Sequence, residues 1–130
     1  MKGVPETALG QMYREHIGHI LEKDIEKLVD QYTEDCLLIS SFSKEPQYYR
    51  GHEGVRKHMM GILEIEDLDT EIAFWAETDN PSTLMIVEAI NMRTAAGESK
   101  MRFADSWVLR DGLIAIHFAG MTQYPDGSVA

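Results

Sequence analysis

The chain has 130 residues, a length that fits one domain with a single hydrophobic core. Hydrophobic residues make up 44% of it, and no apolar run approaches the roughly 20 residues that a membrane span needs. The formal net charge is −10 and there is no dense basic cluster, which argues against nucleic acid as a partner. The N-terminus has no apolar signal-peptide core, so we expect a cytoplasmic protein without a membrane partner.

Neither the cysteine nor the acidic residues point to a metal site. Cys36 is the only cysteine, which excludes an intrachain disulfide and a thiolate zinc site, and we expect it to be buried. The acidic run over residues 64–71 lacks the spacing and the turn glycine of a calcium loop. The histidines show no close pair with metal-ligand spacing. We therefore expect no metal and no cofactor.

Helical periodicity fills the first third of the chain. The first predicted helix has an apolar stripe made of Leu9, Met12, Tyr13, His16, Ile17, Ile20 and Leu21. Asp24 can cap a second helix, whose apolar face ends with Tyr32, and a short strand follows over residues 36–40. Residues 41–51 read as a loop. A third helix then places Val55, Met59, Ile62 and Leu63 on one face, together with His58.

The second half changes to strands joined by turns. We predict strands over residues 70–78, 83–93, 100–110 and 113–123, with ordered structure ending at residues 124–127. The joining turns lie at residues 79–82, at residues 95–98 and at Asp111-Gly112, which is a strong hairpin signal. Helices first and hairpin-linked strands later predict an α+β domain, in which three helices pack on a curved antiparallel sheet.

Three segments, in this order and spacing, resemble the SnoaL-like branch of the nuclear transport factor 2-like superfamily. Residues 23–35 resemble its second helix and the acidic exit into the first strand. Residues 49–58 resemble its glycine-led third helix, and residues 103–114 its penultimate strand and closing hairpin. The resemblance covers nearly the whole chain, so we interpret residues 1–130 as a single SnoaL-like domain.

The resemblance implies a cone-shaped, cystatin-like α+β barrel, with a curved sheet wrapped on a long helix and a hydrophobic pocket at its wide end. It also implies a homodimer that packs sheet against sheet. The relatives include ketosteroid isomerases, polyketide cyclases and a phenazine-biosynthesis branch. Some relatives are isomerases, cyclases, dehydratases or hydrolases and others only bind ligands, so fold does not settle function.

Asp105 is the most informative catalytic candidate. It alternates with Phe103, Trp107 and Leu109, so it shares a face with bulky apolar groups. A carboxyl group in such surroundings should have a raised pKa and could donate a proton at neutral pH. The resemblance places it where ketosteroid isomerases carry an oxyanion-stabilising aspartic acid. The alternative is a partly exposed acid bonded to the backbone or to Arg102.

His16 is a second catalytic candidate, as a hydrogen-bond donor or a general base. By the resemblance it falls where ketosteroid isomerases place an oxyanion-binding tyrosine; the alternative is a core histidine bonded to a carbonyl. The catalytic carboxylate of those enzymes lies on the strand after the second helix. The matching positions here are Ser40 and Ser41, so steroid-type proton transfer by that base is disfavoured.

His117 is the third catalytic candidate. It alternates with Ala115, Ala119 and Met121, whose small members leave space beside it. The phenazine-biosynthesis branch carries a glutamate where this chain has Ala119. His117 could take that role, oriented by Asp105, or it could be an ordinary pocket or core histidine.

Glu88 interrupts an apolar run, and its face depends on the register of its strand. With a four-residue turn at residues 95–98 it lies opposite Asp105, and two close carboxyl groups would share a proton. A shift of one residue moves it to the outer face, which is the interpretation we favour. The candidate ligand-binding residues are Tyr13, Tyr32, His58, Glu88, Phe103, Trp107 and Met121, with the tyrosines on the first two helices equally explained as core.

These residues favour a cofactor-independent isomerase, cyclase or dehydratase that acts on a small apolar carbonyl compound. In that reading Asp105 binds the carbonyl oxygen and His117 or His16 moves the proton. A non-catalytic binder of a small hydrophobic molecule would use the same pocket, and a protein-interaction module would use the exposed sheet. The direction in which Asp105 and His117 point separates these functions.

Overall fold

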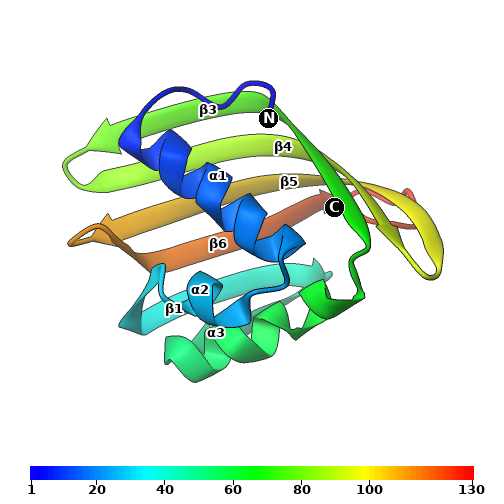
Figure 1. Cartoon of the computed structure of the whole chain (residues 1–130), viewed down its shortest axis with the longest axis horizontal. Coiled ribbons are helices and arrows are strands. Elements are labelled where there is room, and N and C mark those ends of the chain that lie inside the picture. Colours follow the sequence, from blue (N-terminus) through cyan, green and yellow to red (C-terminus); the bar gives the residue numbers. More distant parts are fainter.

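The computed structural model describes residues 1–130 as an α+β fold, in which helices cover one face of a curved six-stranded sheet (Figure 1). The strands lie in the order β2-β1-β6-β5-β4-β3. The helices are α1 (Ala8–Leu21), α2 (Ile25–Val29), α3 (Gly51–Met59) and the 3-10 helix η1 (Met60–Glu64). The strands are β1 (Tyr32–Ser43), β2 (Glu45–Arg50), β3 (Asp67–Asp79), β4 (Ser82–Thr94), β5 (Gly97–Arg110) and β6 (Leu113–Gln123). The predicted fold class is confirmed.

The long helix α1 lies across the sheet, and capping residues fix where it and α2 begin (Figure 1). The Thr7 side chain accepts a hydrogen bond from the Gly10 N–H, and the Asp24 side chain accepts one from the Lys27 N–H, as the sequence predicts for Asp24. These bonds satisfy backbone donors that have no partner inside the helix. The predicted inner stripe of α1 is confirmed for Tyr13, His16 and Ile17, which are buried, but not for Leu21, which is exposed at the end of the helix.

Two predictions for residues 29–51 are wrong. The second helix ends at Val29, so Tyr32 does not lie on a helix but begins strand β1. Residues 45–50 form strand β2 rather than a loop, and they pair with β1 in an antiparallel hairpin. The third helix holds Val55 and Met59 in the core as predicted, whereas Leu63 beyond it is exposed.

The sheet is not wholly antiparallel, contrary to the prediction. β1 pairs with β6 in parallel, and residues 37–40 align with residues 116–119. The remaining neighbours are antiparallel. The parallel pair joins the hairpin β1–β2 to the four-stranded meander β3–β6, so that one continuous sheet curves around α1 (Figure 1).

Tight turns set the register of the meander. Asp111 and Gly112 have φ values of 53° and 77°, both in the left-handed region that a two-residue hairpin turn requires. The turn between β4 and β5 is also two residues long, since Thr94 pairs with Gly97. It is therefore shorter than the four-residue turn predicted there, and the partner of Glu88 moves from Asp105 to Phe103. A change of two residues keeps each side chain on the same face.

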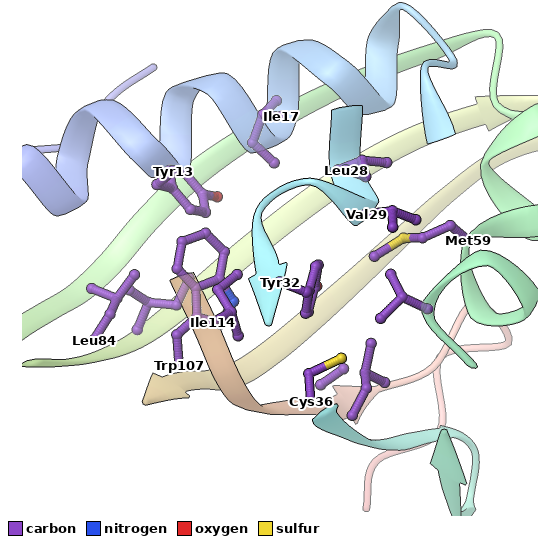
Figure 2. Close-up of a cluster of buried hydrophobic side chains, with 14 of the residues drawn as sticks. Tyr13, Ile17, Leu28, Val29, Tyr32, Cys36, Met59, Leu84, Trp107 and Ile114 are labelled. Carbon is purple, nitrogen blue, oxygen red and sulfur yellow. The ribbon is translucent and has the colours of Figure 1, made fainter. Parts of the chain in front are cut away.

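The main core lies between α1 and the sheet, where Tyr13 and Ile17 point toward Trp107 and Ile114 (Figure 2). Cys36 is buried in this core, as predicted. The C-terminal residues fold back rather than ending ordered structure at residue 124, because Val129 bridges to Gln123 and Tyr124 is buried. None of the helices has the length and apolar character needed to cross a membrane.

Candidate functional site

A cavity of about 320 Å³ lies between α1, α3 and the inner face of the sheet. Of its 25 lining residues, 16 are hydrophobic, and none is lysine or arginine. Its polar members come from six elements: Tyr13 and His16 from α1, His58 from α3, Glu64 from η1, Glu88 and Thr94 from β4, Asp105 from β5 and His117 from β6. An apolar cavity with a few convergent polar groups is the usual form of a small-molecule site.

Glu88 and Asp105 are the two acids deep in this cavity. The Glu88 residue is 4% exposed and the Asp105 side chain 14%. Burial raises the pKa of Glu88 to about 8, and repulsion from Asp105 adds to the shift. Burial also raises the pKa of Asp105 to about 7. Two interacting carboxyl groups of this kind hold a shared proton near neutral pH.

The Glu88 carboxyl group has one direct hydrogen-bond donor in the protein. The Tyr13 hydroxyl donates to Glu88 Oε2, which favours the ionised carboxylate and partly offsets the effect of burial on its pKa. Burial and the nearby carboxyl group in turn raise the pKa of Tyr13 well above its ordinary value. Tyr13 thus remains a proton-bearing donor at neutral pH. The structure places Glu88 on the cavity face, so the outer-face interpretation was wrong.

Asp105 is held by the neighbouring strand. The backbone N–H of Gly120 on β6 donates to Asp105 Oδ1 at 2.9 Å, which lowers the pKa of the carboxyl group and opposes the effect of burial. This bond fixes the carboxyl plane, and the second oxygen, Oδ2, is left on the side of His117. Asp105 is therefore bonded to the backbone, as the alternative to a catalytic role predicted, and it lines the cavity as well.

His117 reaches the cavity from β6 beside Trp107, its cross-strand partner on β5. Its Nδ1 lies 2.7 Å from the Tyr32 hydroxyl. Its Nε2 is buried, has no hydrogen-bond partner, and lies 3.8 Å from Asp105 Oδ2, which is beyond hydrogen-bond range. Burial lowers the pKa of His117 to about 3, so the ring is neutral at physiological pH. Asp105 and His117 thus face one another without the direct bond of an acid–histidine pair.

His16 and His58 complete the imidazole groups of the cavity. His16 Nδ1 lies 2.8 Å from Gln31 Oε1, and burial lowers the His16 pKa to about 3. His58 packs between the rings of Phe42 and Tyr49, and burial lowers its pKa to about 4. Both rings are neutral at physiological pH, so neither supplies a positive charge to a ligand.

The structure brings nearly all of the predicted site residues together. Those that line the cavity are Tyr13, His16, His58, Glu88, Phe103, Asp105, Trp107, His117 and Met121. Tyr32 does not line it, because it lies behind His117 and contacts the imidazole Nδ1. Sequence reasoning missed Gln31, which contacts His16 from the segment after α2. No three His, Cys, Asp or Glu side chains converge as a metal-binding group would.

A second, larger hollow of about 650 Å³ lies at the β4–β5 turn and the C-terminal segment. It is lined by acidic, basic and neutral polar side chains with one hydrophobic residue. None of the predicted site residues reaches it. The smaller, apolar cavity is therefore the candidate site.

The model of the SnoaL-like domain family matches residues 13–117. Among solved structures, AusH from Aspergillus nidulans is 12% identical with a TM-score of 0.75, over 96% of this chain and 92% of that chain. A protein assigned as a SnoaL-like polyketide cyclase from Shewanella putrefaciens is 10% identical with a TM-score of 0.73, over 90% and 91%. An NTF2-like protein from Anabaena variabilis is 15% identical with a TM-score of 0.73, over 91% and 89%.

At these identities the likeness to solved structures shows a shared fold. The sequence has no significant match among curated proteins. The family model matches the sequence itself, from Tyr13 on the first helix to His117 on the last strand, and both residues line the cavity. The chain therefore belongs to the SnoaL-like family.

Proposed function

We propose that the protein is a cofactor-independent acid–base enzyme, an isomerase, cyclase or dehydratase, that acts on a small apolar carbonyl compound. One observation carries this proposal: Glu88 and Asp105 lie in one apolar cavity, and their pKa values are raised to about 8 and about 7. A carboxyl pair that shares a proton near neutral pH supplies both an acid and a base.

The proposed reaction has two proton-transfer sites, the carbonyl oxygen and the carbon next to it. The protonated member of the pair donates a hydrogen bond or a proton to the carbonyl oxygen. The ionised member takes a proton from the carbon next to the carbonyl, which gives an enol, and the proton then returns to another carbon or leaves with a departing group. The apolar walls exclude water and strengthen both interactions.

The walls of the cavity also support a neutral substrate. No lysine or arginine lines the cavity, and its three histidines are neutral at physiological pH. A carboxylate or phosphate group on the ligand would be buried beside Glu88 and Asp105 without a partner, which is strongly unfavourable. A neutral carbonyl oxygen carries no such cost.

The test is proton exchange on a simple apolar ketone, because exchange reports the first step without knowledge of the product. The protein should speed the exchange of the α-protons of 2-tetralone in deuterated water, followed by NMR. Asp105→Asn and Glu88→Gln should each lower the rate by about 10²–10⁴, the usual contribution of general acid–base catalysis. Glu98→Gln is the matched control, because Glu98 is an exposed acid on the same strand as Asp105.

Exchange no faster than in buffer, or exchange that survives in both variants, would overturn the catalytic proposal. The second candidate function is then a binder of a small hydrophobic molecule. It is supported by the position that carries a base in ketosteroid isomerases, where Ser41 uses its hydroxyl to accept a bond from the Met121 N–H. The mostly hydrophobic lining supports binding in either case.

We further propose that the outer face of the sheet forms a homodimer interface. A row of outward side chains crosses all six strands: Ala76, Met85, Ser106, Phe118, Ile39 and Tyr48 are successive cross-strand neighbours. Met85, Phe118 and Tyr48 are about half exposed or more. Large apolar groups gathered on one face favour contact with another protein surface.

A further inference from the structure

We propose that Gln31 holds His16 in the tautomer that carries its proton on Nδ1, so that His16 Nε2 is a hydrogen-bond acceptor that selects ligands with a hydroxyl group. The inference deepens the proposed function and rests on it, since it concerns the same cavity. Gln31 acts through His16 and is a positioning residue. Its side chain lies outside the cavity lining.

The direction of the Gln31 amide follows from its second contact. Gln31 Nε2 donates to the backbone carbonyl oxygen of Met12 at 3.1 Å. The amide oxygen is therefore the atom that faces His16 Nδ1, at 2.8 Å. A carbonyl oxygen only accepts hydrogen bonds, so Nδ1 must carry the hydrogen. The reversed amide would place its oxygen against the Met12 carbonyl oxygen, so two acceptors would face each other and the bond to Met12 would be lost.

The backbone of Gln31 is fixed as firmly as its side chain. Its carbonyl oxygen accepts a hydrogen bond from the Ile114 N–H on β6 at 2.8 Å, and its own N–H donates to the Leu28 carbonyl at 3.1 Å. The residue is 8% exposed. Gln31 thus connects α1, α2 and β6, and rotating its amide away would leave buried polar groups without partners.

The other nitrogen of His16 has a different environment. His16 lines the cavity, and its Nε2 makes no hydrogen bond in the protein and is not among the fully buried polar atoms that lack a partner. Because the only N–H hydrogen of the neutral ring is on Nδ1, Nε2 presents a lone pair. Burial keeps the ring unprotonated at neutral pH. The group that satisfies Nε2 must therefore be a donor, and on a neutral apolar molecule this is a hydroxyl.

The two halves of the cavity therefore favour different groups on one ligand. The carboxyl pair of Glu88 and Asp105 has a proton to give, which suits a carbonyl oxygen. His16 Nε2 has only a lone pair to offer, which suits a hydroxyl hydrogen or an enol. The ligand class is a neutral apolar compound that carries both a hydroxyl and a carbonyl group.

Nitrogen NMR of the imidazole rings tests the tautomer without any ligand. The wild-type His16 signals, assigned by their loss in His16→Phe, should show a protonated Nδ1 and an unprotonated Nε2. Gln31→Met removes the acceptor and should give a mixture of tautomers or the Nε2–H form. Gln31→Glu keeps an acceptor for Nδ1–H, so the wild-type tautomer should remain and the His16 pKa should rise. Gln11→Met is the matched control, because Gln11 lies on the exposed side of α1.

Calorimetry with 2-naphthol and 2-methoxynaphthalene tests the selection. The second probe carries a methyl group in place of the hydroxyl hydrogen, so it cannot donate a hydrogen bond. The wild-type protein and Gln11→Met should bind 2-naphthol about threefold to tenfold more tightly, the range expected of one net hydrogen bond. Gln31→Met should lose or reverse this preference, and Gln31→Glu should keep it.

Three results would overturn the inference. They are a protonated Nε2 in the wild type, an unchanged tautomer in Gln31→Met, and equal or undetectable binding of the two probes by the wild type. If Gln31→Met does not fold, the tautomer of the wild type and the pKa of His16 in Gln31→Glu still decide the case. Neither readout needs turnover, so a failed proton-exchange test and a failed tautomer assignment are separate results.

Discussion

Five titratable side chains of the cavity, which are buried or partly buried, make the stability of this protein depend on pH in two opposite ways. Glu88 and Asp105 have raised pKa values, so their contribution is complete below their ordinary pKa of about 4 and is lost as the pH rises through 7 to 8. The three cavity histidines have lowered pKa values. Their contribution is present above their ordinary pKa of about 6.5 and is lost as the pH falls toward 3 to 4.

The free energy of unfolding should therefore be largest near about pH 6.5. Between pH 6.5 and 8.5 we expect the wild type to lose roughly 2–5 kcal/mol, because both buried carboxyl groups must ionise. Glu88→Gln should lose less than half as much, since the neutral amide does not ionise and no longer repels Asp105. Urea unfolding at the two pH values measures the difference. Glu98→Gln should follow the wild type, and an equal loss in Glu88→Gln would contradict the linkage.

At the scale of the element, the contact between β5 and β6 depends on the absence of a side chain at Gly120. A Cβ atom there would lie 2.5 Å from the carbonyl oxygen of Ala104 on the facing strand. The strands would have to separate, and the Gly120 N–H would move away from Asp105. Glycine at this position therefore serves both the strand pairing and the site.

We expect Gly120→Ala to lower the free energy of unfolding by about 1–3 kcal/mol, as an overpacked position does. The pKa of Asp105 should rise, because the N–H that lowers it is displaced. Urea unfolding and an NMR titration of the carboxyl group measure the two effects. Gly18→Ala is the control: a Cβ there meets nothing within 4 Å, and in the interior of α1 it should stabilise by about 0.5–1 kcal/mol. An Asp105 pKa that stays unchanged in Gly120→Ala would contradict the role assigned to this bond.

The elements that could be predicted are those whose signals are local. The Asp111-Gly112 turn and the cap at Asp24 depend on backbone angles and bonds within a few residues. The end of α2 could not be predicted in this way. Tyr32 continues the helical spacing, but the carbonyl oxygen of Gln31 bonds to Ile114 on β6, and this distant pairing starts a strand instead.

The same distinction applies to the site. Asp105 and His117 were found because each alternates with apolar residues on a strand, and strand alternation survives small errors in the turns. Glu88 depended on the turn length, and the real turn differs from the predicted one by an even number of residues, which preserves its face. Gln31 gave no signal, because it lies in the turn after α2 while its partner His16 lies on α1, and only the packing of these segments brings them together.

At the scale of the whole molecule, the outer face of the sheet should decide the oligomeric state. We expect the wild type to sediment with about twice the 14.8 kDa mass of one chain. Met85→Glu combined with Phe118→Glu should give monomers, because charges would be buried in the proposed interface without partners. Leu21→Glu is the control, since Leu21 is a similarly exposed apolar residue at the end of α1. A wild type of single-chain mass at all concentrations would contradict the dimer.

The parallel pairing of β1 with β6 has a consequence for the order in which the protein is made. The bonds that build the site join residues far apart in the chain: Tyr13 contacts Glu88, 75 residues later, and Tyr32 contacts His117, 85 residues later. A nascent chain that lacks β6 has no His117, no Gly120 donor for Asp105 and no partner for the inner edge of β1. Translation must therefore pass β6 before a binding cavity exists, and a product that terminates before β6 has none.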